Sequence, residues 1–180
     1  MRIFIVGPMA SGKSTLGKKL AQTLNIDFVD TDKEIEKKAG AEISWIFEVE
    51  GEKGFRERER KALKKSINKV DIVISTGGGI VSEKKNRDLM MAKGKVVYLK
   101  TPLELQLKRT EKDKKRPLLA KGNKKKILEA LKKEREPRYE EIADITIDQN
   151  GQKNRKSIID EIIDKPVSYT HLTLPTICSV

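Results

Sequence analysis

The 180-residue chain has one cysteine, one histidine and few aromatic residues, and none of its apolar runs is long enough to span a membrane. A single cysteine cannot form an internal disulfide, which favours a reducing compartment and predicts a cytoplasmic protein. No signal peptide is visible before the first strand-like run. The scarcity of aromatic side chains argues against a surface that stacks on nucleic-acid bases. This length and composition predict one globular domain with a substantial core.

Charge is abundant and unbalanced, since 39 Lys and Arg residues face 27 Asp and Glu residues and give a formal net charge of +12. Such an excess can indicate a nucleic-acid partner or an anionic ligand. The basic residues alternate with acids, as in Arg-Glu-Arg-Glu-Arg at residues 56–60, rather than forming one block. We therefore expect a solvated surface around a site for an anionic small molecule, with no nucleic-acid and no membrane partner.

The last fourteen residues contain no Lys, Arg, Asp or Glu, although these residues crowd the preceding sequence. They follow a completed helical pattern and carry the only histidine, His171, and the only cysteine, Cys178. We expect residues 1–165 to form the single domain and residues 166–180 to be a non-native or disordered tail. His171 and Cys178 are therefore poor candidates for catalysis.

Short apolar runs alternate with helical patterns along the domain. The runs that we expect to form strands are residues 2–6, 27–29, 72–75, 96–99 and 145–147. This alternation is typical of an α/β fold with a parallel sheet that helices cover on both faces. Two stretches lie outside that scaffold. Residues 32–60 have the pattern of helices inserted after the second strand, and residues 111–124 are charged and aperiodic, as in a mobile loop.

Residues 7–14, Gly-Pro-Met-Ala-Ser-Gly-Lys-Ser, fit the phosphate-binding pattern G-x-x-x-x-G-K-[ST]. A strand-like run precedes them and leucines at helical spacing follow, which is the strand, loop and helix context that the pattern requires. In such a loop the backbone N–H groups contact phosphate oxygens, Lys13 places its charge between the β- and γ-phosphates, and the Ser14 hydroxyl can hold Mg²⁺. The alternative is a glycine-rich turn that merely joins two elements.

Asp30-Thr31-Asp32 follows the second predicted strand, at the sheet edge where ligands of open parallel sheets bind. Two carboxylates beside a phosphate loop suggest a metal role for one and a substrate-hydroxyl role for the other. The alternative is that Asp32 is a helix N-cap, because Asp is favoured at that position.

Gly77, Gly78 and Gly79 follow the third predicted strand. Three glycines in succession allow a ligand to lie against bare backbone. The alternative is an ordinary strand-to-helix turn, which rarely needs three glycines.

Four arginines stand near these motifs in the sequence: Arg56, Arg109, Arg116 and Arg135. An arginine fork can hold a carboxylate or a phosphate through two parallel hydrogen bonds. For any single arginine in so basic a chain, however, surface solvation is the simpler interpretation.

In this order the motifs resemble those of the shikimate kinase family, small P-loop kinases of the nucleoside-monophosphate-kinase-like group. The resemblance runs from about Arg2 to Ile163. It rests on the phosphate loop, the Asp-Thr-Asp run, Phe55-Arg56, the triple glycine, Arg116-Pro-Leu-Leu and Arg135-x-Pro-x-Tyr. It implies a P-loop NTPase fold, a monomer, and ATP-dependent phosphorylation of the 3-hydroxyl of shikimate in the route to the aromatic amino acids.

The resemblance also implies roles on the nucleotide side. Lys13 would be catalytic, Asp30 and Ser14 would serve Mg²⁺, Arg109 would lie on adenine, and the catalytic Arg116 would arrive with a lid over residues 111–124. The implied contacts of ATP are Gly7, Ala10, Ser11, Gly12, Lys13, Ser14, Thr15, Arg109 and Arg116.

On the acceptor side, Asp32 would bind the substrate hydroxyls as base or orienter, and Arg56 and Arg135 would clamp the carboxylate. Glu59 would support them. The remaining implied contacts of shikimate are Gly77, Gly78 and Gly79 and an apolar wall of Ile43, Phe47 and Phe55. Ordinary helix core is an equally good interpretation of Ile43.

Two positions depart from the family pattern. Ala10 stands where the family usually has another glycine, which the loop tolerates unless that position needs a positive φ. Asn154 stands near the place where the family often has a proline beside adenine.

The alternatives to a shikimate kinase are a kinase for gluconate or a nucleoside monophosphate, a basic nucleic-acid-binding NTPase, and a P-loop module without catalysis.

Overall fold

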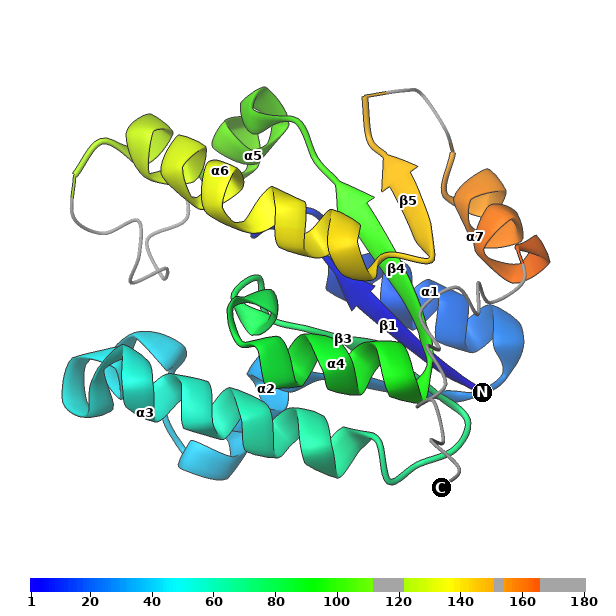
Figure 1. The fold of residues 1–180 in the computed structure, drawn as a ribbon, viewed down its shortest axis with the longest axis horizontal. Coiled ribbons are helices and arrows are strands. Elements are labelled where there is room, and N and C mark those ends of the chain that lie inside the picture. The colour runs from blue at the N-terminus through cyan, green and yellow to red at the C-terminus, as the bar shows by residue number, and fades with distance from the viewer. Residues whose placement is uncertain (112–121, 151–153, 166–180) are drawn as a thin grey trace, which may run out of the picture.

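The computed structural model describes residues 1–111, 122–150 and 154–165. Its centre is a five-stranded sheet in the order β2-β3-β1-β4-β5, in which every neighbouring pair is parallel. Figure 1 shows the strands side by side. Their bounds are β1 Arg2–Val6, β2 Asp27–Asp30, β3 Ile72–Ser75, β4 Lys95–Lys100 and β5 Ile145–Asp148. The five predicted strands are confirmed, and none differs by more than one residue at either end.

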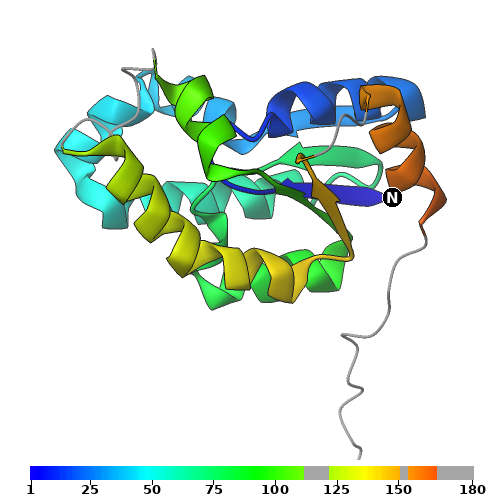
Figure 2. The ribbon, with the colours of Figure 1, turned by 90° about the horizontal axis from the view of Figure 1, so that it is seen from above.

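Helices cover both faces of the sheet, which confirms the predicted three-layer architecture (Figure 2). One face carries α1 and α7, and the other carries α4, α6 and the end of α3. The helices are α1 Lys13–Leu24, α2 Thr31–Ala39, α3 Ile43–Ser66, α4 Lys84–Lys93, α5 Leu103–Thr110, α6 Lys124–Ile142 and α7 Arg155–Asp164, with a short 3₁₀ helix, η1, at Ile80–Ser82. No helix in these described ranges is long and apolar enough to cross a membrane.

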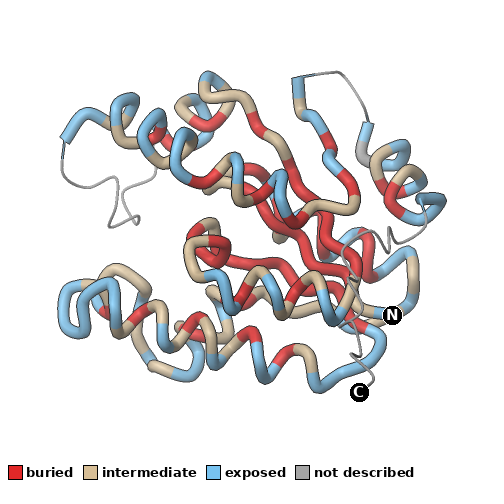
Figure 3. The backbone as a smooth tube through the Cα atoms, in the orientation of Figure 1, coloured by how far each residue is buried: buried red, intermediate tan, exposed pale blue. Residues whose placement is uncertain are grey.

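The core has two halves because side chains alternate along each strand. In β1, Ile3 and Ile5 face α1 and α7, whereas Phe4 and Val6 face the opposite helices. Figure 3 shows the buried residues concentrated in the strands. Burying each large apolar side chain contributes about 1.5–3 kcal/mol, so the sheet is a rigid base for the loops that follow its strands.

The predicted insertion after β2 is the helix pair α2 and α3, which packs around a small core of Ile35, Ile46 and Phe55. The α3 helix is kinked at Gly51, whose φ of 69° and ψ of −178° are not helical. The insertion was expected over residues 32–60, but α3 continues to Ser66 because Leu63 packs on the sheet.

Two predicted segments fall wholly or largely outside the described residues. These are most of the lid, with Arg116, and the tail with His171 and Cys178. At the end of the predicted lid, the Asn123 side chain accepts hydrogen bonds from the backbone N–H groups of Lys125 and Lys126. This cap starts α6 at Lys124.

Candidate active site

The predicted motifs meet at the carboxyl ends of the strands. A cavity of about 650 Å³ lies there, and its lining includes the phosphate loop, Asp30, Asp32, Gly78 and Arg109. Parallel strands end at one edge of a sheet, so loops that are distant in the sequence come together. The volume is in the range of small-ligand sites.

The phosphate loop closes on its own lysine. Gly12 is the N-cap of α1, and the helix begins at Lys13. The Lys13 Nζ donates to the carbonyl oxygens of Gly7 at 2.9 Å and Pro8 at 2.7 Å, and to Ser11 Oγ at 3.2 Å. The ammonium is thus held at the loop, at the N-terminal end of a twelve-residue helix, where the helix dipole also favours an anion.

Ala10 lies in the left-handed region, with φ of 60°. We expected the loop to tolerate alanine here unless the position needed a positive φ, and the φ of Ala10 is positive. The left-handed conformation costs a non-glycine residue roughly 1–2 kcal/mol, and the larger entropy that glycine loses on folding offsets about 0.5–1 kcal/mol of that difference. The loop is therefore strained at the residue that departs from the family pattern.

A chain of hydrogen bonds links the phosphate loop to the end of β5, at one edge of the sheet. The Arg109 Nη1 donates to the Ala10 carbonyl oxygen at 2.9 Å and to Gln149 Oε1 at 3.1 Å, and Gln149 Nε2 donates to the Ser11 carbonyl oxygen at 2.7 Å. Sequence reasoning missed Gln149, although it directly follows β5, where ligand-facing residues are expected. Arg109 lies at the rim of the cavity, and its contact with adenine stays a prediction.

The Asn154 side chain accepts a hydrogen bond from the Ser157 N–H and caps α7. This cap is a structural role, and the adenine side of the site stays unassigned at this residue.

Asp30 joins the end of β2 to the phosphate loop. One of its carboxylate oxygens accepts from Ser14 Oγ, and the other accepts from the backbone N–H groups of Asp32 at 3.1 Å and Lys33 at 3.3 Å. Asp30 is therefore the N-cap of α2, and the interpretation of Asp32 as the cap is wrong. With this role filled, the Asp32 side chain lines the cavity.

The same pair fits a magnesium site. Mg²⁺ in kinases is held by one or two carboxylates together with substrate phosphates, and Ser14 with Asp30 offers a hydroxyl and a carboxylate. The described residues contain no cluster of three or more His, Cys, Asp or Glu side chains, so nucleotide phosphates and water would complete the coordination of Mg²⁺.

Two carboxylates converge on Gly77. A Cβ built there would lie 2.7 Å from both Asp32 Oδ1 and Glu59 Oε1, so any other residue at this position would displace these carboxylates. Glu59 is completely buried, and its Oε1 has no hydrogen-bond partner among the described residues. Burial raises the pKa of Glu59, while the charge of Arg56 opposes the shift. The triple-glycine turn, which joins β3 to η1, is thus packed against acidic side chains, and its contact with a substrate stays a prediction.

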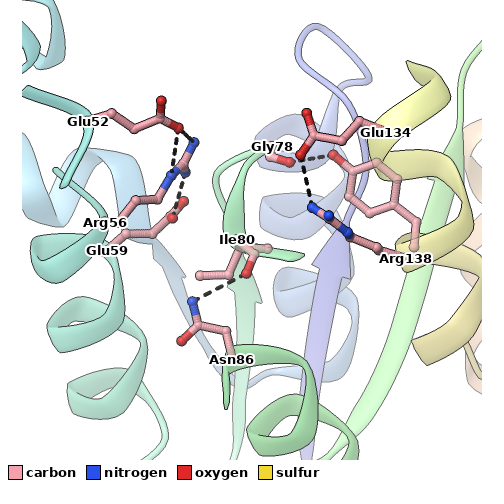
Figure 4. A network of polar contacts seen from close by, with 9 residues as sticks. Glu52, Arg56, Glu59, Gly78, Ile80, Asn86, Glu134 and Arg138 are labelled. Atoms are coloured by element: carbon pink, nitrogen blue, oxygen red, sulfur yellow. Dashed lines mark hydrogen bonds and ion pairs between the residues drawn. The ribbon is translucent and has the colours of Figure 1, made fainter. Parts of the chain in front are cut away.

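Arg56 and Arg135 both lie near Glu59, one from α3 and the other from α6. Arg56 Nη1 donates to Glu59 Oε2 at 2.8 Å (Figure 4), and the charge of Arg135 also lowers the pKa of Glu59. Arg135 is only 7% exposed, and its Nε has no hydrogen-bond partner within the described ranges. Burying a guanidinium N–H without an acceptor is costly, so this group is suited to an anionic ligand. Surface solvation is therefore the wrong interpretation of both arginines.

Tyr139 fixes the middle of the glycine turn. Its hydroxyl donates to the Gly78 carbonyl oxygen, and its ring stacks on Tyr98 with centroids 5.0 Å apart. Burial raises the pKa of the Tyr139 hydroxyl, so it remains a donor at neutral pH. The sequence reasoning gave Tyr139 no role, because nothing in the sequence pairs it with a glycine 61 residues away.

The three residues of the predicted apolar wall lie together in the helical insertion. Phe55 is buried in its core, and Ile43 and Phe47 pack partly buried against the same cluster. The rings of Phe47 and Phe55 have centroids 4.6 Å apart, and the Arg56 guanidinium lies 5.5 Å from the Phe55 ring. All three therefore contribute to helix core, and their contact with a substrate stays a prediction.

Comparisons with known proteins agree with these motifs. Residues 9–166 match the family model described as shikimate kinase. Shikimate kinase 1 of Pectobacterium atrosepticum is 51% identical over 163 residues, which cover 90% of this chain and 94% of that protein. The structure of shikimate kinase from Acinetobacter baumannii in complex with shikimate has a TM-score of 0.85 and 46% identity, and covers 90% of each chain.

A more distant match shows the fold alone. It is deoxyadenosine kinase from M. mycoides with bound dATP, which has a TM-score of 0.60 at 16% identity and covers 92% of this chain and 98% of that one.

Proposed function

The chain belongs to the shikimate kinase family, and we propose that it transfers the γ-phosphate of ATP to the 3-hydroxyl of shikimate, giving shikimate 3-phosphate and ADP. The observation that carries this proposal is the pair Arg56 and Arg135 around buried Glu59, beside the glycine turn and next to the phosphate loop. Shikimate is a compact ring with one carboxylate and several hydroxyls, so two arginines and one aspartate complement it.

Asp32 is the residue that orients the acceptor. It lies in the first turn of α2, at the cavity that the phosphate loop also lines. A carboxylate there accepts the proton of the reacting hydroxyl and aims its oxygen in line with the γ-phosphate. Arg56 and Arg135 fix the opposite end of the ring, so the substrate has one productive orientation.

The phosphate loop holds the nucleotide. Its backbone N–H groups and Lys13 contact the phosphates, where Lys13 exchanges the Gly7 and Pro8 carbonyls for phosphate oxygens. Mg²⁺, bound through Ser14 and Asp30, would neutralise charge on the β- and γ-phosphates. Arg116 would add positive charge from a lid that excludes water from the reaction.

The other properties inferred from the sequence remain proposals: a monomer in the cytoplasm, and Arg109 against adenine. Nucleoside monophosphates are less suited as acceptors, because two arginines and the glycine turn complement a compact carboxylated ring rather than a base. Gluconate also carries a carboxylate, so the assay below has to separate it from shikimate.

The test is an ADP-release assay with ATP, Mg²⁺ and three acceptors: shikimate, gluconate and a nucleoside monophosphate. We expect turnover with shikimate and background rates with the others. Good turnover of another acceptor without turnover of shikimate would contradict the proposal.

A further inference from the structure

Arg56 already binds two carboxylates of its own chain. Its Nη1 donates to Glu59 Oε2 at 2.8 Å, and its Nη2 and Nε donate to Glu52 Oε1 at 2.9 and 3.3 Å (Figure 4). Two negative charges thus surround one positive charge at the position where a substrate carboxylate has to bind.

The two carboxylates are held very differently. The Glu59 side chain is 1% exposed and cannot reach solvent, whereas the Glu52 side chain is 58% exposed. Glu52 also follows the kink at Gly51, so it stands in the first turn of the second half of α3. Glu59 therefore stays paired with Arg56, whereas the Glu52 side chain can rotate away from Arg56 toward solvent.

The guanidinium offers an incoming carboxylate only the edge that Glu52 occupies. Nη1 faces Glu59, and the group lies so close to Gly79 that a Cβ there would be 2.0 Å from Nη1 and 2.4 Å from Nη2. The remaining edge is Nε with Nη2, which can hold a carboxylate through two parallel hydrogen bonds. One oxygen of Glu52 accepts from both of these nitrogens.

We propose that Glu52 is an internal competitor of the substrate carboxylate for Arg56. This inference rests on the proposed function. Binding of shikimate displaces Glu52 into solvent, and the Nε–Nη2 edge passes from one carboxylate to the other.

The displaced ion pair is open to solvent at its Glu52 end, and ion pairs that solvent reaches are weak. Glu52 therefore lowers the affinity for shikimate by a small factor without blocking the site. Removing the charge of Glu52 should therefore raise the affinity for shikimate. Removing a residue that merely supports Arg56 would lower it.

The test is Glu52→Gln, with the KM of shikimate from steady-state kinetics and its Kd from calorimetry. We expect both to fall about two- to fivefold, the effect of an ion pair that solvent reaches, with kcat and the KM of ATP unchanged. The matched control is Glu57→Gln, which removes the same charge from the same helix. Glu57 is 54% exposed and pairs with Lys61 rather than with Arg56.

A higher KM and Kd in Glu52→Gln would overturn the proposal, because Glu52 would then be preorganising Arg56. If Glu57→Gln changed the KM and Kd of shikimate by the same factor, the proposal would also be overturned. The effect would then come from the loss of one negative charge anywhere on this helix and not from the contact with Arg56. Unchanged kcat and circular dichroism establish that the variant is folded. Failure of the proposed function is seen separately, as absent turnover of shikimate by the unsubstituted enzyme.

Discussion

The proposed nucleotide side and the proposed acceptor side of the site are built in different ways. The phosphate loop is eight consecutive residues, held by backbone carbonyls, one lysine and the start of one helix. The acceptor side brings together Asp32, Arg56 with Glu59, the glycine turn and Arg135, which come from four separate stretches of the chain. The first therefore depends on local backbone geometry, and the second depends on charges that the fold buries together.

This difference predicts where substitutions act. Changes in the phosphate loop should alter backbone strain and nucleotide contacts, whereas changes on the acceptor side should alter charge balance and orientation. Glu59 shows the contrast, because its burial raises its pKa and the arginines around it compensate only in part. Such a group is costly to the fold and useful to the site.

The largest effect on activity should come from Asp32, which lines the same cavity as the phosphate loop. Asp32→Asn keeps the shape of the side chain but removes the proton acceptor, so kcat with shikimate should fall about 10²- to 10⁴-fold with a much smaller change in KM. Glu34→Gln is the control, since it removes a charge from the same turn of α2. A near-normal kcat in Asp32→Asn would exclude Asp32 as base or orienter.

Removing the buried charge of the acceptor side should separate function from stability. In Glu59→Gln the KM of shikimate should rise about 10- to 100-fold, because Arg56 loses a hydrogen bond to a charged partner.

The stability of Glu59→Gln should change in the opposite sense. The folded protein raises the pKa of Glu59 above its ordinary value of 4.5 and so binds this proton more tightly than the unfolded chain does. Stability from this group is therefore complete below pH 4.5 and is lost as the pH rises through the raised pKa. Urea unfolding should show Glu59→Gln gaining on the unsubstituted protein from pH 4.5 to pH 7. A variant that loses stability relative to it over this interval would contradict the assignment.

The smallest effect should come from the strained position on the nucleotide side. Ala10→Gly removes the left-handed strain at φ of 60° and should raise the free energy of unfolding by up to about 1 kcal/mol. In urea unfolding the control is Ala130→Gly, which is exposed inside α6 and should lose about 0.5–1 kcal/mol. If both substitutions destabilise the protein equally, the loop is not strained at Ala10.

Sequence patterns predicted the parts of the molecule whose causes are local. The five strands, the phosphate loop and the positions of Asp30 and Asp32 follow from alternating apolar runs and one contiguous motif. The alternative interpretation, in which Asp32 is the N-cap of α2, was wrong, since Asp30 is the cap. The sequence could not separate the two, because Asp suits a cap at either position and only the backbone geometry distinguishes them.

Contacts between distant parts of the chain could not be predicted in the same way, on either side of the site. The hydrogen bond of Tyr139 to Gly78 and the bridge of Gln149 to Ser11 join residues that are 61 and 138 positions apart. No periodicity carries such a pairing, and only the packed fold produces it. The second carboxylate on Arg56 is near in sequence, yet an i,i+4 pair on a charged helix resembles any other surface pair.

The central claim is that two arginines on the acceptor side select the substrate by its carboxylate, independently of the phosphate loop. It is tested most directly by kcat/KM for shikimate and for its uncharged methyl ester, in the unsubstituted enzyme and in Arg135→Lys. A hydrogen-bonded charge is worth about 1.5–3 kcal/mol, so the enzyme should prefer the acid by roughly 10- to 100-fold. Arg135→Lys should reduce this preference severalfold, mainly by raising the KM of shikimate, while the KM of ATP is unchanged. An equal loss on the acid and the ester would contradict the claim.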